Sequence, residues 1–188
     1  MNDWRQGNWL GTNMGHRISL DAPDPAEIDI RDIACGLSKI ARFNGQTNVF
    51  YSVAEHCINA SKLVPAEFRL QALLHDASEA YICDVPTPLK RMLGDTYKDI
   101  ETRIQIAIGR AFNVELFPLP DVVKRADRIM LITEHHALQQ VPADWGPDYE
   151  GEIVFPNFKP MCETPENMAD IYEGLFLDYI RDHRLLPI

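Results

Sequence analysis

The sequence lacks paired cysteines and long hydrophobic runs. Its four cysteines stand apart with no C-x-x-C pair, which excludes zinc-finger and thioredoxin-like proteins, and we expect each to be a small buried hydrophobic residue. No segment approaches the roughly 18–20 uninterrupted apolar residues of a membrane span. The first residues also lack the charged-then-apolar layout of a signal peptide. We therefore expect a cytoplasmic protein.

Basic residues are also scarce, since 18 Lys and Arg face 28 Asp and Glu, for a formal net charge of −10. Binding to a nucleic-acid backbone needs a basic surface, so we expect neither a nucleic acid nor a membrane as partner. A small nucleotide stays possible, because a few local cations and a metal ion can hold one. With 188 residues the chain can close one core without disulfides, and we interpret residues 1–188 as a single domain.

Apolar residues recur at helical spacing along most of the chain, which predicts an all-α, single-domain bundle of about six helices. Residues 1–28, rich in Gly, Asn, Pro and Asp, predict an irregular arm or short hairpin. Residues 140–163 predict a long loop, either a binding lid or a packed surface excursion. Capping and proline signals predict helix starts at Asp29, Ser52, Pro65, Thr96, Asp121 and Thr164.

The first two helices carry specific expectations about their ends. The helix after Asp29 is predicted to end near residues 44–45 and to present Arg42 and Phe43 in its last turn. Ser52 and Glu55 have the form of a capping box for the second helix, which should run to about residue 63.

Later helices are predicted from similar signals. Thr96 with Asp99 resembles a capping pattern, and Asp121 can cap the next helix, where Asp127 lies inside an apolar stripe. The terminal helix is expected to bury a stripe consisting of Met168, Ile171, Tyr172, Leu175, Phe176, Tyr179 and Ile180.

The stretch 73–90, LLHDASEAYICDVPTPLK, combines apolar helical spacing with several ionisable residues. A continuous helix would place His75 and Glu79 on one face, with Asp76 about 100° around the axis. An unpaired buried carboxylate or imidazole costs several kcal/mol, whereas a divalent cation makes such a cluster favourable. His56 and Asp127, near the buried faces of two other helices, could complete it. Two imidazoles and two carboxylates suit Mn²⁺, Co²⁺, Fe²⁺ or Zn²⁺.

Other histidines have simpler interpretations. A lone histidine such as His56 is usually hydrogen-bonded to a neighbour, and only the later residues favour a ligand role. His135 and His136 invite a metal site, but adjacent helical residues point about 100° apart, and a helix end favours cationic imidazoles by itself. His16 and Arg17 could reach a ligand, although a surface role is favoured.

The order H…HD…D, together with RFNGQTNVFYSVAEH at 42–56 and LLHDASEAYICDVPTPLK at 73–90, resembles the HD-domain metal-dependent phosphohydrolases. Within them it is most similar to the small HD-domain 5′-deoxynucleotidases and the phage-encoded dATP triphosphohydrolases. The similar region runs from about Asp29 to Glu134, over half of the chain. The resemblance implies an HD-domain helical fold and a homo-oligomer, a dimer or larger.

The resemblance also implies roles for individual residues. Glu79 corresponds to the family's catalytic acid, Asp84 to the residue that contacts the deoxyribose hydroxyl, and Arg42 and Phe43 to contacts on the phosphate and base side. Lys90 is added from its charge and its position after the Pro-Thr-Pro turn. The implied metal ligands are His56, His75, Asp76 and Asp127.

HD enzymes that hold two metals generally carry further histidines between the HD pair and the last Asp, but no histidine lies between His75 and His135 here. The resemblance therefore implies one divalent metal ion, Co, Mn, Zn or Fe, and not a two-metal site. The expected reaction is hydrolysis of purine deoxynucleotides at the α-phosphate, with dATP or another dNTP giving deoxynucleoside and triphosphate. One alternative is a 5′-deoxynucleotidase acting on dNMPs. An alternative of another class is a non-catalytic helical module with a structural ion, for which four closing ligands suffice.

Overall fold

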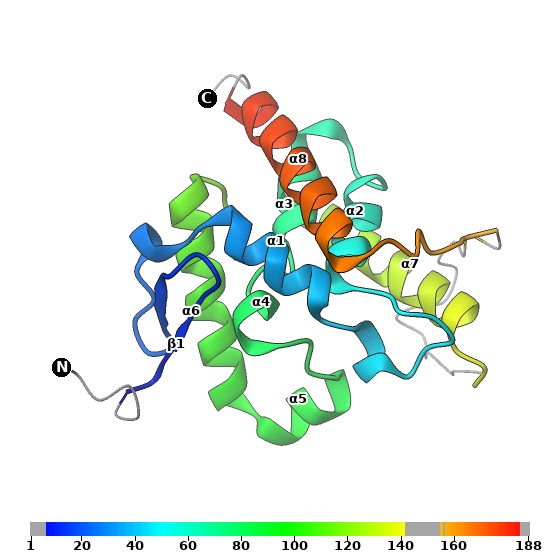
Figure 1. The fold of residues 1–188 in the computed structure, drawn as a ribbon, viewed down its shortest axis with the longest axis horizontal. Helices are drawn as coiled ribbons and strands as arrows, with labels where there is room; N and C mark the ends of the chain where they lie inside the picture. Colours follow the sequence, from blue (N-terminus) through cyan, green and yellow to red (C-terminus); the bar gives the residue numbers. More distant parts are fainter. Residues whose placement is uncertain (1–6, 142–154, 156, 185–188) are drawn as a thin grey trace.

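The computed structural model describes residues 7–141, 155 and 157–184. Over these residues the chain is mostly helical with one small hairpin, so the all-α prediction is confirmed (Figure 1). No helix in the described ranges has the length and apolar character to cross a membrane. With η for a 3-10 helix, the elements are β1 Trp9–Gly11, β2 Arg17–Ser19, η1 Pro25–Glu27, α1 Ile30–Lys39, η2 Arg42–Gly45, α2 Val53–Ser61, η3 Ala66–Phe68, α3 Arg69–Leu74, α4 Glu79–Ile82, α5 Thr87–Leu93, α6 Asp95–Phe112, α7 Asp121–Leu138 and α8 Pro165–Arg184.

The predicted N-terminal hairpin is present, with β1 and β2 paired antiparallel. The side chain of Ile18 in β2 is fully buried in the core. Asp32 of α1 fixes the hairpin, because its carboxylate accepts from the backbone N–H of Met14 at 2.8 Å and lies 2.8 Å from Nδ1 of His16. His16 therefore has a structural partner in Asp32. Residues 1–6 of the predicted arm lie outside the described part of the chain.

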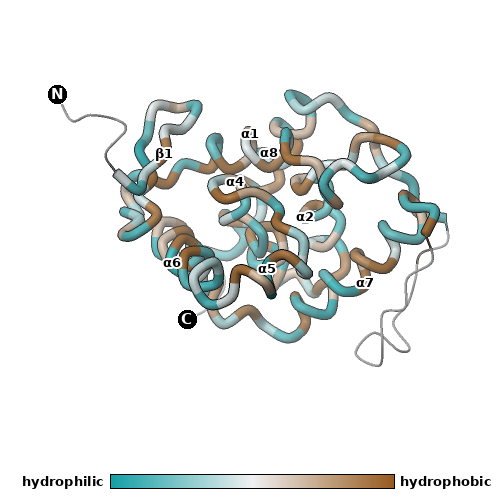
Figure 2. Tube along the Cα trace, turned by 90° about the horizontal axis from the view of Figure 1, so that it is seen from below, coloured by the Kyte–Doolittle hydropathy of each residue, from teal (hydrophilic) through white to brown (hydrophobic). Residues whose placement is uncertain are grey.

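The core forms where α1 packs against α8 and α4, and where α2 packs against α3, α7 and α8 (Figure 1). Along α6 and α7, hydrophobic and hydrophilic positions alternate as in amphipathic helices (Figure 2). A Cβ at Gly36 would lie 3.0 Å from the backbone oxygen of Ala80, so this glycine allows α1 and α4 to approach closely. The hydroxyl of Tyr172 in α8 donates to the carbonyl of Leu73 at 2.7 Å, which ties α8 to the end of α3.

The first predicted helix is shorter than expected. It is capped by Asp29 as predicted but ends at Lys39, and Arg42 begins a separate 3-10 turn. Phe43 and Asn44 there have φ of 55° and 54°, in the left-handed region that disfavours a bulky side chain. Arg42 and Phe43 are therefore held by a strained turn and not by the last turn of a helix.

The helix carrying the HD pair is also broken. It ends at Leu74 and restarts at Glu79, so the prediction of one continuous helix is wrong. Gln105 of α6 explains the break, because its amide Nε2 donates to the carbonyls of Leu74 at 3.1 Å and His75 at 2.8 Å. The backbone between the two helices tightens into turns, with Glu79 N–H bonded to the Asp76 carbonyl at 2.9 Å.

Several predicted helix signals need correction. Thr96 and Asp99 do not cap α6, which begins at Asp95 after Gly94, and Asp121 is the first residue of α7 and not its cap. Ser52 caps α2 as predicted, but that helix ends at Ser61 and not near residue 63. The capping box is incomplete, because the Glu55 carboxylate accepts from the Met161 N–H at 2.6 Å.

Burial differs from expectation at several positions. Ile171 is exposed on α8, whose buried side consists of Met168, Tyr172, Phe176 and Ile180. Cys83 and Cys162 are exposed and Cys35 is half-buried, whereas Cys57 is buried as expected. The predicted loop 140–163 falls largely outside the described residues. Its described part includes Phe158, whose ring meets that of Tyr51 edge-on at 6.0 Å.

Candidate functional site

Four side chains predicted as metal ligands converge on one point, although they come from separate segments. Nε2 of His56 in α2 lies 3.2 Å from Nε2 of His75, which directly follows α3. Oδ2 of Asp76 is 3.1 Å from the His75 Nε2, and Oδ1 of Asp127 in α7 is 3.2 Å from the His56 Nε2. The histidines are buried, whereas the side chains of Asp76 and Asp127 are 22% and 41% exposed. The cluster therefore opens to solvent on its carboxylate side.

Hydrogen bonds at the other ring nitrogens assign the tautomers of both histidines. Nδ1 of His75 lies 2.8 Å from the carbonyl of Ala72, and a carbonyl can only accept, so this nitrogen carries the proton. Nδ1 of His56 lies 2.7 Å from Oε1 of Glu134 and donates in the same way. Each neutral ring consequently presents the unprotonated Nε2 to the cluster.

This arrangement brings four acceptor atoms together without a donor between them. Burial lowers the pKa of an imidazole, but the negative charge of Asp76 outweighs it and raises the pKa of His75 well above its usual value. The excess of negative charge in the cluster therefore favours binding of a cation. Two imidazolium ions at this separation would repel each other, whereas one divalent cation can satisfy both nitrogens and the carboxylates. His56, His75 and Asp76 thus form a group that could hold a metal ion.

Glu134 is a functional candidate that sequence reasoning missed. Its carboxylate is fully buried in α7 and accepts from three donors: His56 Nδ1 at 2.7 Å, the Tyr51 hydroxyl at 2.8 Å and Arg42 Nε at 3.2 Å. Burial by itself would raise the pKa of Glu134, but His56 and Arg42 outweigh it and lower that pKa. One signal was available, because Glu134 lies seven residues, or two turns, after Asp127 on the same face of the helix.

Glu79 lies beside the cluster and is 4% exposed. Among the residues that the structure describes, none forms a hydrogen bond with its Oε2. Burial, together with the charges of Asp76 and Asp84, raises the pKa of Glu79 well above its usual value. A raised pKa favours the protonated form of this carboxyl group, which can donate a proton.

The predicted cations are near these carboxylates but already have partners. Arg42 is 7% exposed, and its Nη1 lies 3.7 Å from Oδ2 of Asp76. Lys90 Nζ lies 2.7 Å from Oε1 of Glu101 and 3.5 Å from Oε1 of Glu79. A substrate phosphate would therefore meet Lys90 already shared between two carboxylates.

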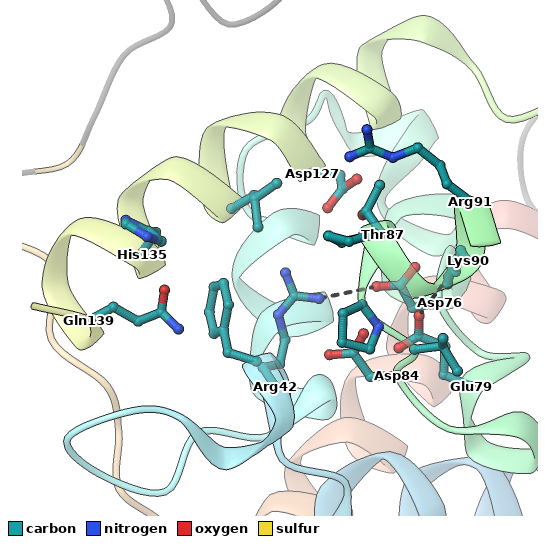
Figure 3. A pocket seen from close by; sticks show the side chains of 15 residues that line it. Arg42, Asp76, Glu79, Asp84, Thr87, Lys90, Arg91, Asp127, His135 and Gln139 are labelled. Atoms are coloured by element: carbon teal, nitrogen blue, oxygen red, sulfur yellow. Dashed lines mark hydrogen bonds and ion pairs between the residues drawn. The ribbon is translucent and has the colours of Figure 1, made fainter. Parts of the chain in front are cut away.

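A cavity of about 600 Å³ joins these groups, within the size range of small-molecule sites. Figure 3 shows Asp76, Glu79, Asp84 and Lys90 at one end and His135 and Gln139 at the other, with Arg42 between them. The predicted substrate residues Arg42, Phe43, Asp84 and Lys90 all line this pocket. Burial raises the pKa of Asp84. His135 lines the pocket as well, but His136 is exposed, so the pair does not act as one ligand group within the described residues.

Comparison with known proteins identifies one relative along nearly the whole chain and another along part of it. No family model matches. The chain is 43% identical over 179 residues to the uncharacterized protein YfdR of Escherichia coli, covering 93% of this chain and 95% of that protein. It is 39% identical over 127 residues to an uncharacterized protein of Rhodobacter capsulatus, covering 63% of this chain and 64% of the relative. The names of these relatives assign no activity.

Proposed function

The chain belongs to the same family as YfdR of Escherichia coli, and we propose that it is an HD-domain phosphohydrolase that uses a divalent metal ion to hydrolyse deoxynucleotides at the α-phosphate. One observation carries the proposal: four acceptor atoms of His56, His75, Asp76 and Asp127 converge at the edge of a pocket that also holds an orphaned acid, Glu79. These four residues are the ones whose order along the chain, H…HD…D, resembles the HD-domain phosphohydrolases.

The ligand set fits one transition-metal ion. Two imidazole nitrogens and two carboxylate oxygens suit Mn²⁺, Co²⁺, Fe²⁺ or Zn²⁺, and the exposed carboxylate side leaves room for water and substrate. An ion bound there would supply Lewis-acid charge and lower the pKa of a coordinated water.

The remaining roles belong to side chains of the pocket. Arg42 neutralises charge on the phosphate, held in place by Glu134 through its Nε. Glu79 donates a proton to the oxygen that leaves phosphorus, a role that its raised pKa favours. Asp84 faces the deoxyribose hydroxyl, as the resemblance implies. A structural ion would need neither Glu79 nor this pocket, which weighs against a non-catalytic module.

The length of the phosphate chain has two candidates. The sequence favours a triphosphate, dATP or another dNTP, because residues 42–56 and 73–90 resemble the phage-encoded triphosphohydrolases more than the 5′-deoxynucleotidases. The charge around the pocket favours a monophosphate as the second candidate, because Lys90 is already paired with Glu101 and Glu79. A monophosphate adds less negative charge to a pocket that is lined by the carboxylates Asp76, Glu79, Asp84 and Asp127 and by the cations Arg42, Lys90 and Arg91.

A substrate screen tests this proposal. The metal-free protein is supplied with Mn²⁺, Co²⁺ or Zn²⁺ and incubated with each deoxynucleoside mono-, di- and triphosphate, and both products are identified by mass spectrometry. We expect a deoxynucleoside together with phosphate or triphosphate. Bound metal without turnover of any deoxynucleotide would instead support the non-catalytic module.

A further inference from the structure

The pocket extends beyond the groups that the proposed reaction uses. Its end away from Glu79 and Lys90 has a different chemical character (Figure 3). Burial and the neighbouring His136 lower the pKa of His135, so that ring is neutral near pH 7. Apolar walls with a few polar groups suit a planar organic group better than a phosphate. The residues that line this end are Phe43, Leu131, His135 and Gln139.

Helix α7 relates this end of the pocket to the metal cluster. Lining residues occur at every fourth position after Asp127, so they share one face of the helix. At 1.5 Å per residue, Leu131, His135 and Gln139 follow Asp127 at about 6, 12 and 18 Å along the axis. Gln139 directly follows the last residue of α7, and its side-chain amide points into the pocket toward Arg42 (Figure 3). A ligand with its phosphate at Asp127 therefore extends toward Gln139.

The amide of Gln139 has a fixed orientation. Its Nε2 donates to the carbonyl oxygen of Gln46 at 3.0 Å. The loop that carries Gln46 is in turn bound to the end of α7, because the N–H of Asn48 donates to the Leu138 carbonyl at 3.0 Å. If the amide turned round, its Oε1 would face the Gln46 carbonyl, acceptor against acceptor. Oε1 and the second Nε2 hydrogen are consequently the groups that Gln139 offers to the pocket.

We propose that this end of the pocket holds the base of the nucleotide and that Gln139 determines which base is accepted, favouring an amino group over an oxo group next to a ring nitrogen. The proposal rests on the proposed function for the identity of the ligand as a nucleotide. Phe43 and Leu131 supply the apolar walls for the ring.

The hydrogen-bond pattern gives the direction of the preference. Adenine presents an amino donor at its 6-position beside the acceptor N7, the pair that a glutamine amide reads with both of its groups. Hypoxanthine has the same ring with an oxo group at that position, which would face the fixed Oε1 as a second acceptor. A good bidentate pair discriminates by about 5- to 150-fold, so we expect adenine to be favoured by about 10-fold.

Binding measurements test this independently of turnover. Metal-loaded Glu79→Gln protein is titrated calorimetrically with the mono- and triphosphates of deoxyadenosine and of deoxyinosine. We expect about 10-fold tighter binding of the adenine ligand in whichever phosphate series binds. In the double variant with Gln139→Met the ratio should fall below about twofold. Gln140→Met is the matched control, since Gln140 is exposed and does not line the pocket, and it should keep the full preference.

The possible outcomes distinguish the role of Gln139 in base selection from the proposed hydrolysis of deoxynucleotides. Equal affinity for the two bases, a preference that survives Gln139→Met, or no binding of any of these nucleotides would overturn the role of Gln139. A protein that shows the preference but hydrolyses no deoxynucleotide would retain the base site and lose the proposed reaction. Gln139→Met also removes the hydrogen bond to the loop that carries Gln46, so a ligand without a base, 2-deoxyribose 5-phosphate, is titrated as well. Unchanged affinity for this ligand in the Gln139→Met variant shows that the effect lies at the base.

Discussion

Nδ1 of His56 donates to the buried carboxylate of Glu134 across 2.7 Å, while the other oxygen of that carboxylate accepts from Arg42 at 3.2 Å. One side chain therefore orients both the proposed metal ligand His56 and the proposed phosphate-binding cation Arg42. Carboxylates that hold a ligating histidine fix its tautomer and raise its basicity. This makes Glu134 the support of both halves of the site.

Glu134→Gln should weaken metal binding while the fold persists. An amide presents one acceptor where the carboxylate presents two, so His56 and Arg42 cannot both keep their partner. Loss of such a partner typically costs 10- to 100-fold in metal affinity, and we expect a change of that order in the Kd for Mn²⁺ or Co²⁺ measured by competition with a chelating dye.

Glu55→Gln provides the control for that experiment. Glu55 is another buried carboxylate, one residue from His56, but it bonds the backbone of Met161. Its substitution should leave the metal Kd within about twofold, well below the loss expected at Glu134. Equal losses in both variants would mean that burial of any carboxylate matters here, and the specific role of Glu134 would be abandoned.

Glu79→Gln should slow turnover without loss of metal. The amide keeps the size of the side chain but cannot transfer a proton, and general acid–base help is worth about 10²- to 10⁴-fold. The measurements are kcat on the best deoxynucleotide and metal content by mass spectrometry. Glu101→Gln removes the other partner of Lys90 and should lower kcat by less than about 10-fold. Full turnover by the Glu79 variant would show that this role is assigned to the wrong residue.

The hairpin should be held more firmly in mild acid. The hydrogen bond from His16 to Asp32 raises the pKa of His16 above its usual value near 6.5. The stabilisation is fully present below pH 6.5 and is lost as the pH rises through the folded-state pKa. The gap in melting temperature between the wild type and His16→Gln should therefore be wider at pH 6 than at pH 8.5. A gap that does not change with pH, or the same pH trend in an Asp32→Asn background, would contradict this pairing.

Local sequence signals predicted the parts of the fold that depend on local chemistry. Asp29 and Ser52 cap their helices as expected, because an N-cap bonds only to residues two or three positions on. The four predicted metal ligands also converge, since each lay at the buried face of an amphipathic segment.

The remaining features depend on distant partners. The break at His75 is made by Gln105, 30 residues away, and Glu134 bonds to residues 78 and 92 positions earlier in the chain. Periodicity within one helix carries no information about such pairings. The turn at Phe43 escaped prediction for a similar reason, because a positive φ at a bulky residue persists only where the surrounding structure holds it.

The proposed reaction depends on one metal ion held by His56, His75, Asp76 and Asp127. The most direct test is a titration of the metal-free protein with Mn²⁺ or Co²⁺ while release of deoxynucleoside is followed. We expect turnover to rise linearly and to level off at one equivalent of metal per chain, and we expect no such rise for His75→Ala. A break at two equivalents, equal turnover in the presence of a chelator, or no release at any metal concentration would contradict it.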